Sequence, residues 1–223
     1  MPELHWKGDG LAVCWFAMKA VNFSGVERFP SKLLCVGRNY VEHIEELGNA
    51  IPEQMVLFFK PNASIGSVLR AEDGEALHYE GEICFGVEEG QFRYVGFGLD
   101  LTKRELQGRL RAEGLPWERS KAFRGAGLFS AFVPFEGAME DLSLQLWIDG
   151  VLAQEGGVKQ MINKPQEILD ELLAVTDLED FDIVMTGTPA GVGRVSAGSR
   201  FEGVVLCSGK ELVRCSWEAQ GAD

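Results

Sequence analysis

The chain has 223 residues, of which 46% are hydrophobic, and a formal net charge of −13 at pH 7. A chain of this length and composition can bury a full hydrophobic core, so one principal domain is expected. The acidic balance offers no basic face of the kind that nucleic acids and anionic membranes require. The expected partners are therefore small molecules or other protein.

Cysteine usage indicates a reducing compartment. The cysteines are odd in number, and no two of them have a Cys-x-x-Cys spacing, which argues for buried thiols rather than a disulfide framework. The apolar run from Leu11 to Met18 is too short for a transmembrane helix. We therefore expect a cytoplasmic protein with five free thiols: Cys14, Cys35, Cys84, Cys207 and Cys215.

The first 50 residues predict short strands and one helix. Residues 1–30 carry two strand-like runs, 11–18 and 20–23, and no chemistry. Residues 32–37 predict a buried strand, and residues 40–47 a short helix that Gly48 ends. On that helix His43 and Glu46 are three residues apart, so they can form a hydrogen-bonded pair that activates water. Taken alone, such a pair is more often an ordinary solvated helix face.

The next elements bring acidic residues into strands. Met55 to Phe59 predicts a strand that Lys60 and Pro61 close, and residues 78–87 predict another. In the second strand Glu80 and Glu82 share a face, with Cα atoms about 6.5 Å apart. Two carboxylates this close resist joint ionisation unless a cation lies between them. The plain alternative is a pair of glutamates on the wet face of a half-buried strand.

A third carboxylate follows this pair. The apolar segment 94–99 ends at Asp100, and an antiparallel hairpin would return that end toward the start of the carboxylate strand. Glu80, Glu82 and Asp100 could then converge without a long loop. Three oxygen ligands with no cysteine and no obligatory histidine favour Mg²⁺ or Mn²⁺ over zinc.

A helix is predicted directly after Asp100, with Thr102 and Glu105 as a capping box and Gly114 as its end. Arg104 and Gln107 share one face of it, where the guanidinium could bind a substrate carboxylate, although such an arginine is more often at the surface. Residues 116–134 show no periodicity. They contain Lys121 in an apolar setting, and a buried lysine needs a negative partner.

The C-terminal half is predicted to alternate strands with one helix. Leu142, Leu144 and Leu146 alternate with polar residues, and the Asp149-Gly150 dipeptide predicts a type I′ hairpin turn. Residues 166–175 predict an amphipathic helix with Ile168, Leu169, Leu172 and Leu173 facing inward, residues 181–185 a strand, and residues 204–207 and 212–217 a final hairpin. Many strands and about three helices indicate a β-rich α+β domain.

The loop 186–193 is rich in glycine but lacks the Gly-Lys-Ser/Thr ending of a phosphate-binding loop, so nucleotide binding is not expected. Its backbone N–H groups and the Thr188 hydroxyl could still approach an anion.

Several of these motifs occur together in one order: Gly-Arg-Asn-Tyr at 37–40, Glu80-x-Glu82, Asp100-Leu-Thr with Arg104 and Gln107, Lys121, and Thr-Gly-Thr-Pro at 186–189. In this combination the chain resembles the fumarylacetoacetate hydrolase family, and most of all its small acylpyruvase and oxaloacetate decarboxylase branch. The resemblance implies a mixed β-sandwich roll over residues 31–217, behind an N-terminal extension of residues 1–30. It also implies a Mg²⁺ or Mn²⁺ site and a homodimer.

The resemblance also implies roles for individual residues. It gives the metal ligands as Glu80, Glu82 and Asp100, the catalytic residues as His43, Glu46 and Lys121, and the substrate contacts as Arg38, Arg104, Gln107 and Thr188. The chain departs from the family pattern in two places. A tight turn at 88–91 replaces the usual helix-bearing insert, and residues 124–129 replace a proline-containing segment.

The implied activity is divalent-metal-dependent chemistry on 2-oxo or 2,4-dioxo acids through an enolate that the metal stabilises. Acylpyruvate C–C bond hydrolysis and oxaloacetate decarboxylation are the expected reactions. Keto–enol tautomerisation of oxaloacetate and a 2-hydroxymuconate-type isomerase or decarboxylase of aromatic catabolism are alternatives on the same site. An alternative of another class is a dimer that binds 2-oxo acids without turnover.

Overall fold

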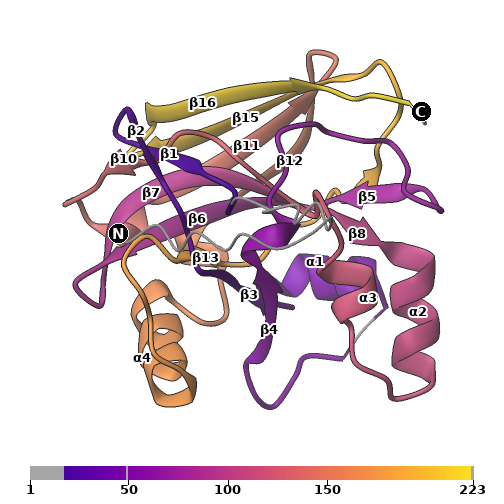
Figure 1. Ribbon diagram of the computed structural model, residues 1–223, viewed down its shortest axis with the longest axis horizontal. Coiled ribbons are helices and arrows are strands. Elements are labelled where there is room, and N and C mark those ends of the chain that lie inside the picture. The colour runs from indigo at the N-terminus through magenta and orange to yellow at the C-terminus, as the bar shows by residue number, and fades with distance from the viewer. Residues whose placement is uncertain (1–17, 49, 222–223) are drawn as a thin grey trace, which may run out of the picture.

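The structure is a computed structural model that describes residues 18–48 and 50–221 (Figure 1). Two sheets pack face to face, which confirms the predicted β-rich sandwich. The larger sheet has seven strands in the order β10-β7-β6-β13-β3-β4, with β9 beside β7, and the smaller has the order β12-β11-β15-β16. The predicted strand at 11–18 and Cys14 lie, apart from Met18, outside the described residues.

The larger sheet is mixed. Its strands β3 (Lys32–Gly37) and β13 (Ile183–Met185) run parallel, while β6 (Gly81–Glu88) and β7 (Gln91–Asp100) form an antiparallel hairpin. The hairpin closes through Glu89 and Gly90, which both have positive φ, as the tight turn at 88–91 predicts. Because both faces of this sheet are covered, β6 is buried over almost its whole length.

The smaller sheet supplies the second layer. Its hairpin of β11 (Leu142–Ile148) and β12 (Val151–Gly157) turns at Asp149 and Gly150, whose φ values of 50° and 79° confirm the predicted type I′ turn. Leu142, Leu144 and Leu146 are all buried, as the alternation predicts. The remaining two strands are β15 (Arg200–Cys207) and β16 (Lys210–Glu218).

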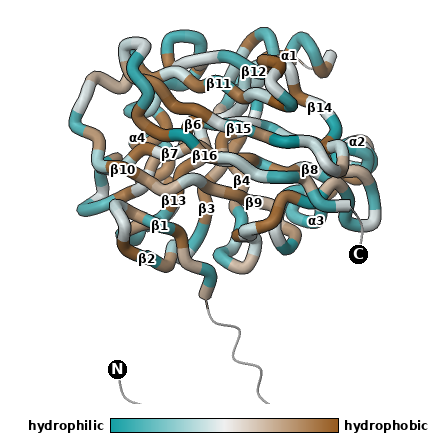
Figure 2. Tube along the Cα trace, turned by 90° about the horizontal axis from the view of Figure 1, so that it is seen from above, coloured by the Kyte–Doolittle hydropathy of each residue, from teal (hydrophilic) through white to brown (hydrophobic). Residues whose placement is uncertain are grey.

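The two layers interlock through aromatic side chains. The rings of Phe97 from β7 and Trp217 from β16 have centroids 6.3 Å apart. At Gly203 of β15 an added Cβ would come within 2.4 Å of the Phe97 ring, so glycine is what allows the sheets to approach there. Figure 2 shows hydrophobic stretches along the central strands of the fold, while many of the outer turns are hydrophilic.

A third, small sheet joins β5 (Leu77–Tyr79), β8 (Thr102–Lys103) and β14 (Gly193–Arg194). The prediction of one continuous strand over 78–87 is wrong, because the chain leaves this small sheet at Tyr79 and enters the larger sheet at Gly81. The return strand makes the reverse crossing between Asp100 and Thr102. Glu80 and Asp100 therefore both lie where the chain changes sheets.

Three helices gather at one end of the sheets, whereas α4 (Pro165–Val175) lies apart from them (Figure 1). They are α1 (Val41–Glu46), α2 (Arg104–Ala112) and α3 (Glu118–Lys121), the last of which the sequence did not predict. In α4 the inward positions Ile168, Leu169 and Leu172 are buried, but Leu173 is 48% exposed, so its predicted burial is wrong. No helix in the described part of the chain is long and apolar enough to cross a membrane.

The predicted capping box of α2 is also wrong. Thr102 belongs to β8, and Oε1 of Glu75 accepts hydrogen bonds from the backbone N–H groups of Glu105 and Leu106 at 3.0 and 3.1 Å. A carboxylate from a distant loop thus satisfies donors that a local cap would otherwise satisfy. Gly114 follows the helix with a φ of 67°, as its predicted role requires.

The remaining elements complete the layers. Phe23 of the N-terminal hairpin stacks on Phe132, with ring centroids 4.6 Å apart, so this hairpin packs against the larger sheet. The described cysteines are all free thiols. The short elements are β1 (Val21–Phe23), β2 (Val26–Arg28), β4 (Val56–Pro61), β9 (Gly127–Phe129), β10 (Val133–Pro134) and the 3₁₀ turns Asn62–Ser64, Met139–Asp141 and Val158–Gln160.

Candidate metal centre and active site

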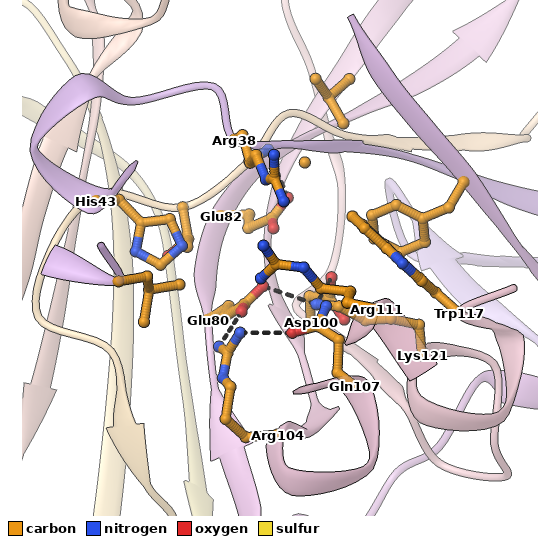
Figure 3. Close-up of a pocket in the computed structure, with 16 residues that line it drawn as sticks. Arg38, His43, Glu80, Glu82, Asp100, Arg104, Gln107, Arg111, Trp117 and Lys121 are labelled. Carbon is orange, nitrogen blue, oxygen red and sulfur yellow. Dashed lines mark hydrogen bonds and ion pairs between the residues drawn. The ribbon is translucent and has the colours of Figure 1, made fainter. Parts of the chain in front are cut away.

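A cavity of about 40 Å³ opens where the sheets meet the three clustered helices (Figure 3). Nine of the ten predicted site residues line it, and Glu46, the tenth, stands behind His43. The nine are Arg38, His43, Glu80, Glu82, Asp100, Arg104, Gln107, Lys121 and Thr188.

The change of sheets brings the acidic residues together. The backbone N–H of Asp100 donates to the carbonyl oxygen of Glu80 at 2.8 Å, so the two crossing points lie side by side. Glu82 follows on β6, opposite Gly98 of β7. One carboxylate oxygen from each of the three residues lies within 4.8 Å of the others, and all three residues are buried. We name Glu80, Glu82 and Asp100 the carboxylate triad.

Two cationic side chains contact the triad from the helices. Nζ of Lys121 lies 2.8 Å from Oε2 of Glu80 and 2.8 Å from Oδ2 of Asp100, and it donates to the Thr102 hydroxyl at 2.6 Å. Arg104 pairs with Oε1 of Glu80. Burial alone would raise the pKa of Glu80, but Lys121 and Arg104 outweigh it and hold that pKa well below its usual value. The negative partner predicted for a buried Lys121 is thus present.

Glu82 is left without a cationic partner among the described residues. Its carboxylate accepts the backbone N–H of Gly187 at 2.8 Å, so the glycine loop donates to an anion of the protein itself. Burial raises the pKa of Glu82 well above its usual value, and the nearby charges of Asp100 and Glu80 raise it further. A cation between these carboxylates would relieve that repulsion.

The donor set fits a hard divalent cation. Oδ1 of Asp100 is buried and forms an ion pair with Nζ of Lys60 at 2.8 Å. The carboxylate of Glu82 pairs with no cation among the described residues, and this leaves the triad able to accept further positive charge. Carboxylate oxygens are the ligands that Mg²⁺ and Mn²⁺ prefer.

Lys60 is a site residue that the sequence analysis missed. Its side chain is fully buried, and Nζ lies 2.8 Å from Oδ1 of Asp100 while donating to the backbone carbonyl of Lys121. In the sequence the Lys60-Pro61 pair looked like the end of a strand, but β4 continues through both residues. The alternation of the strand offered a signal, because it places Lys60 on the same face as Phe58, which lines the cavity.

We expect Lys60→Met to lower the free energy of unfolding of the metal-free protein by about 3–5 kcal/mol, because it leaves Asp100 buried beside one cation fewer. Urea denaturation followed by fluorescence measures the change. Added Mn²⁺ should restore part of the loss, since the cation replaces the missing positive charge. The matched control is Lys159→Met, which removes a 71% exposed lysine from its pair with Asp141. A loss no larger in Lys60→Met than in this control would contradict the expectation.

His43 and Glu46 form the pair that their spacing predicts. Nδ1 of His43 lies 3.3 Å from Oε2 of Glu46, and the backbone N–H of Gly191 donates to the same carboxylate at 3.1 and 3.2 Å. The His43 side chain is 7% exposed and that of Glu46 34%. The solvated-face alternative therefore does not describe His43, whose ring lines the cavity with Nε2 as the remaining nitrogen.

The predicted substrate contacts Arg104, Gln107 and Thr188 lie near the triad, but each already forms hydrogen bonds within the protein. Arg104 pairs with Glu80 and donates from Nη1 to Oε1 of Gln107 at 2.8 Å. The Thr188 hydroxyl donates to the carbonyl oxygen of Gly81 at 2.9 Å and accepts from Gln154. In this arrangement Arg104, Gln107 and Thr188 stabilise the wall of the cavity through contacts within the protein.

Arg111 is a second missed residue that lines the cavity. Arg104, Gln107 and Arg111 have positions i, i+3 and i+7 on α2, so they share one face of the helix. Extending the predicted face of Arg104 and Gln107 by one helical turn would have included Arg111. Trp117, just before α3, lines the same side.

Comparisons with known proteins identify the family of this chain. A model of the fumarylacetoacetate (FAA) hydrolase C-terminal domain matches residues 32–90 and 93–221. Oxaloacetate tautomerase YcgM of Escherichia coli (strain K12) is 34% identical over 186 residues, which cover 75% of this chain and 85% of that protein.

Solved structures show the same fold. A putative fumarylacetoacetate isomerase/hydrolase from Oleispira antarctica superposes with a TM-score of 0.85 at 30% identity, covering 91% of this chain and 100% of that one. Fumarylpyruvate hydrolase from Pseudomonas aeruginosa, solved with Mn²⁺ and pyruvate, gives a TM-score of 0.84 at 26% identity, with coverage of 96% and 100%. The chain belongs to the fumarylacetoacetate hydrolase family.

Proposed function

We propose that this protein is a divalent-cation-dependent enzyme that enolises 2-oxo acids, and that its main reaction is the keto–enol tautomerisation of oxaloacetate. The observation that carries the proposal is the buried carboxylate triad, which faces a cavity that a paired histidine also lines. The 34% identity to an oxaloacetate tautomerase supports this choice of reaction.

The triad would hold Mg²⁺ or Mn²⁺, and the solved Mn²⁺ complex of a related fumarylpyruvate hydrolase supports that class of ion. When bound, the cation supplies Lewis-acid stabilisation of negative charge on the 2-oxo oxygen of the substrate. The remaining chemistry belongs to side chains of the cavity.

Tautomerisation needs a proton removed from C3 of the substrate and a proton delivered to the 2-oxo oxygen. His43 can remove the C3 proton through Nε2, because Glu46 holds Nδ1 and so orients the ring, and the imidazolium that forms can return the proton to the 2-oxo oxygen. Lys121, buried beside the triad, can stabilise the oxyanion as charge develops. Glu46 thus acts through His43, as a positioning residue.

Acylpyruvate hydrolysis is the second candidate, and the His43–Glu46 pair is the observation that favours it. In this reaction the pair would deprotonate a water that attacks the distal carbonyl. The C3–C4 bond then breaks, C4 leaves as a carboxylic acid, and C3 is protonated to give pyruvate. Pyruvate bound to the related fumarylpyruvate hydrolase supports the same class of product. Oxaloacetate decarboxylation would use the same cavity and lose CO₂ at C3 instead.

One experiment separates these reactions. Protein stripped with a chelator and reloaded with Mg²⁺ or Mn²⁺ is assayed for loss of the oxaloacetate enol absorbance, for pyruvate release from an acylpyruvate, and for CO₂ release. We expect metal-dependent enol conversion to be the fastest of the three. Binding of oxalate without any metal-dependent turnover would refute the proposal and identify a 2-oxo acid-binding protein.

We also propose that the protein is a homodimer and that it works in the cytoplasm. The family resemblance supports the first, and the free thiols at Cys35, Cys84, Cys207 and Cys215 are consistent with a reducing compartment. Light scattering on the purified protein and fractionation of cells that express it would test the two statements separately.

A further inference from the structure

The two glutamates of the triad lie on either side of Gly81, and side chains from outside the larger sheet bind both backbone polar groups of that glycine. The Gly81 N–H donates to Oε1 of Gln154 at 2.9 Å, and the Gly81 carbonyl oxygen accepts from the Thr188 hydroxyl at 2.9 Å. Gly81 is the first residue of β6, where the chain enters the larger sheet. The position of its backbone therefore decides where Glu80 and Glu82 are placed.

Gln154 comes from β12 of the smaller sheet, where a β-bulge turns its side chain inward. Gln154 lies opposite Leu146 of β11. The next pair toward the hairpin turn is Leu152 with Trp147, so Ala153 is an extra residue in β12. Because opposite residues share a face and Leu146 is fully buried, Gln154 faces the core and is only 1% exposed. Without the extra residue, Ala153 would lie opposite Leu146 and Gln154 would face the other way.

The side-chain amide of Gln154 is fully hydrogen-bonded. Its Nε2 donates to Oγ1 of Thr188 at 2.8 Å and to the carbonyl oxygen of Pro189 at 2.9 Å. A backbone N–H only donates and a carbonyl oxygen only accepts, so these partners fix which end of the amide faces Gly81. Since Oγ1 of Thr188 accepts from Gln154, its single proton is left for the Gly81 carbonyl oxygen. The bonds close a ring through Gly81, Gln154 and Thr188, which we name the Gln154 network.

The loop that carries Thr188 also contacts Glu82. The backbone N–H of Gly187 donates to the Glu82 carboxylate at 2.8 Å. The Thr186 hydroxyl donates to the carbonyl oxygen of Ile83, also at 2.8 Å. The loop thus contacts three successive residues of β6. A displacement of Thr188 would therefore also move the N–H group that binds Glu82.

We propose that Gln154 is a positioning residue of the metal centre. By holding Gly81 and Thr188, it fixes the two glutamate carboxylates of the triad at the separation that a small divalent cation requires. Gln154 does not line the cavity, so it acts through Glu80 and Glu82. This inference rests on the proposed function, because it needs the triad to bind a cation. A role in folding alone would use the same hydrogen bonds, and the experiment separates the two roles.

Cation selectivity distinguishes positioning from folding. Mg²⁺ requires near-ideal octahedral geometry with oxygen ligands at about 2.0–2.1 Å, whereas Ca²⁺ accepts flexible geometry at about 2.3–2.6 Å. A site whose carboxylates are no longer held therefore loses Mg²⁺ affinity before it loses Ca²⁺ affinity. Partial unfolding lowers the apparent affinity for both ions by the same factor, because both bind only the folded protein.

Gln154→Met keeps a side chain of similar length but removes its hydrogen bonds. In calorimetric titrations of chelator-stripped protein, we expect it to lower Mg²⁺ affinity by about 10-fold to 100-fold, the usual cost of losing an outer partner of a metal site. Ca²⁺ affinity should fall by a smaller factor. The matched control is Gln145→Met on β11, which removes an amide that donates to the exposed Glu155 at 2.8 Å. It should keep wild-type affinity for both ions.

Thr188 gives a second form of the test, which stands even if Gln154→Met does not fold. Thr188→Val removes the hydroxyl and should lower Mg²⁺ affinity more than Ca²⁺ affinity, whereas Thr188→Ser keeps the hydroxyl and should keep the selectivity. Because both residues belong to one network, the effects of Gln154→Met and Thr188→Val should not add. The double variant should bind Mg²⁺ about as well as the weaker single variant.

Two outcomes in Gln154→Met would overturn the inference: Mg²⁺ affinity equal to that of wild type, or equal losses of Mg²⁺ and Ca²⁺ affinity. Thr188→Val with the selectivity of wild type would overturn it as well. Each of these results leaves the proposed function standing, since wild type still binds the cation. Failure of wild type to bind any divalent cation would instead count against the proposed function itself.

Discussion

Glu82→Gln is expected to reduce Mn²⁺ affinity by at least about 100-fold, more than the roughly 10-fold to 100-fold that loss of an outer partner of a metal site costs. Glu82 is the member of the triad that pairs with no cation among the described residues, so its charge is the one most available to a metal. Glutamine has nearly the same shape but lacks that charge. Calorimetric titration of chelator-stripped protein with Mn²⁺ measures the difference.

The same substitution should not unfold the protein. Because burial and the neighbouring carboxylates raise the pKa of Glu82, its charge destabilises the metal-free fold, and a neutral amide relieves that repulsion. We therefore expect the metal-free variant to melt no lower than wild type. Mn²⁺ at about 1,000 times the wild-type Kd should stabilise wild type by about 4 kcal/mol and the variant by no more than about 1.4 kcal/mol, since this concentration is at most about 10 times the Kd of the variant.

The control for this experiment is Glu136→Gln, which removes an exposed carboxylate that does not line the cavity. It should keep wild-type Mn²⁺ affinity and the full stabilisation by Mn²⁺. If Glu82→Gln titrates like this control, the triad is not the metal site.

Local sequence signals were enough to predict much of the fold. The alternation of leucines in residues 142–146 and the Asp149-Gly150 turn each depend on a few neighbouring residues, and both have the predicted form. The approach of Asp100 to Glu80 was also predictable, because a tight antiparallel hairpin leaves few other places for its ends. In each case the physical cause lies within one element or one turn.

What the sequence did not predict depends on contacts between distant segments. The Glu75 carboxylate caps α2 across a gap of about thirty residues, and no local pattern indicates that it does. Likewise, Lys60 pairs with Asp100 although their strands, β4 and β7, are separated by three others in the order of the larger sheet. The break at Glu80 has the same origin, since a strand that changes sheets looks continuous in sequence.

Replacing His43 tests the division of labour between proton transfer and metal binding. His43→Asn should lower the rate of oxaloacetate tautomerisation by about 10² to 10⁴-fold, the usual contribution of general acid–base catalysis. Its affinity for Mn²⁺ and for oxalate should change little, because the ring comes from α1 whereas chelation depends on the crossing strands. A parallel loss of oxalate affinity would show that His43 holds the ligand rather than moves a proton.

Glu46→Gln then distinguishes the two candidate reactions. Glu46 lies behind His43 and is held by Gly191, so the amide keeps the position of the side chain but not its charge. If Glu46 only orients a ring that takes a carbon-bound proton, tautomerisation should fall modestly and its pH profile should shift. If the pair must also generate hydroxide, acylpyruvate hydrolysis should fall much further in the same variant. Measuring both rates on one preparation decides the matter, and equal losses would refute a role for Glu46 that is specific to water.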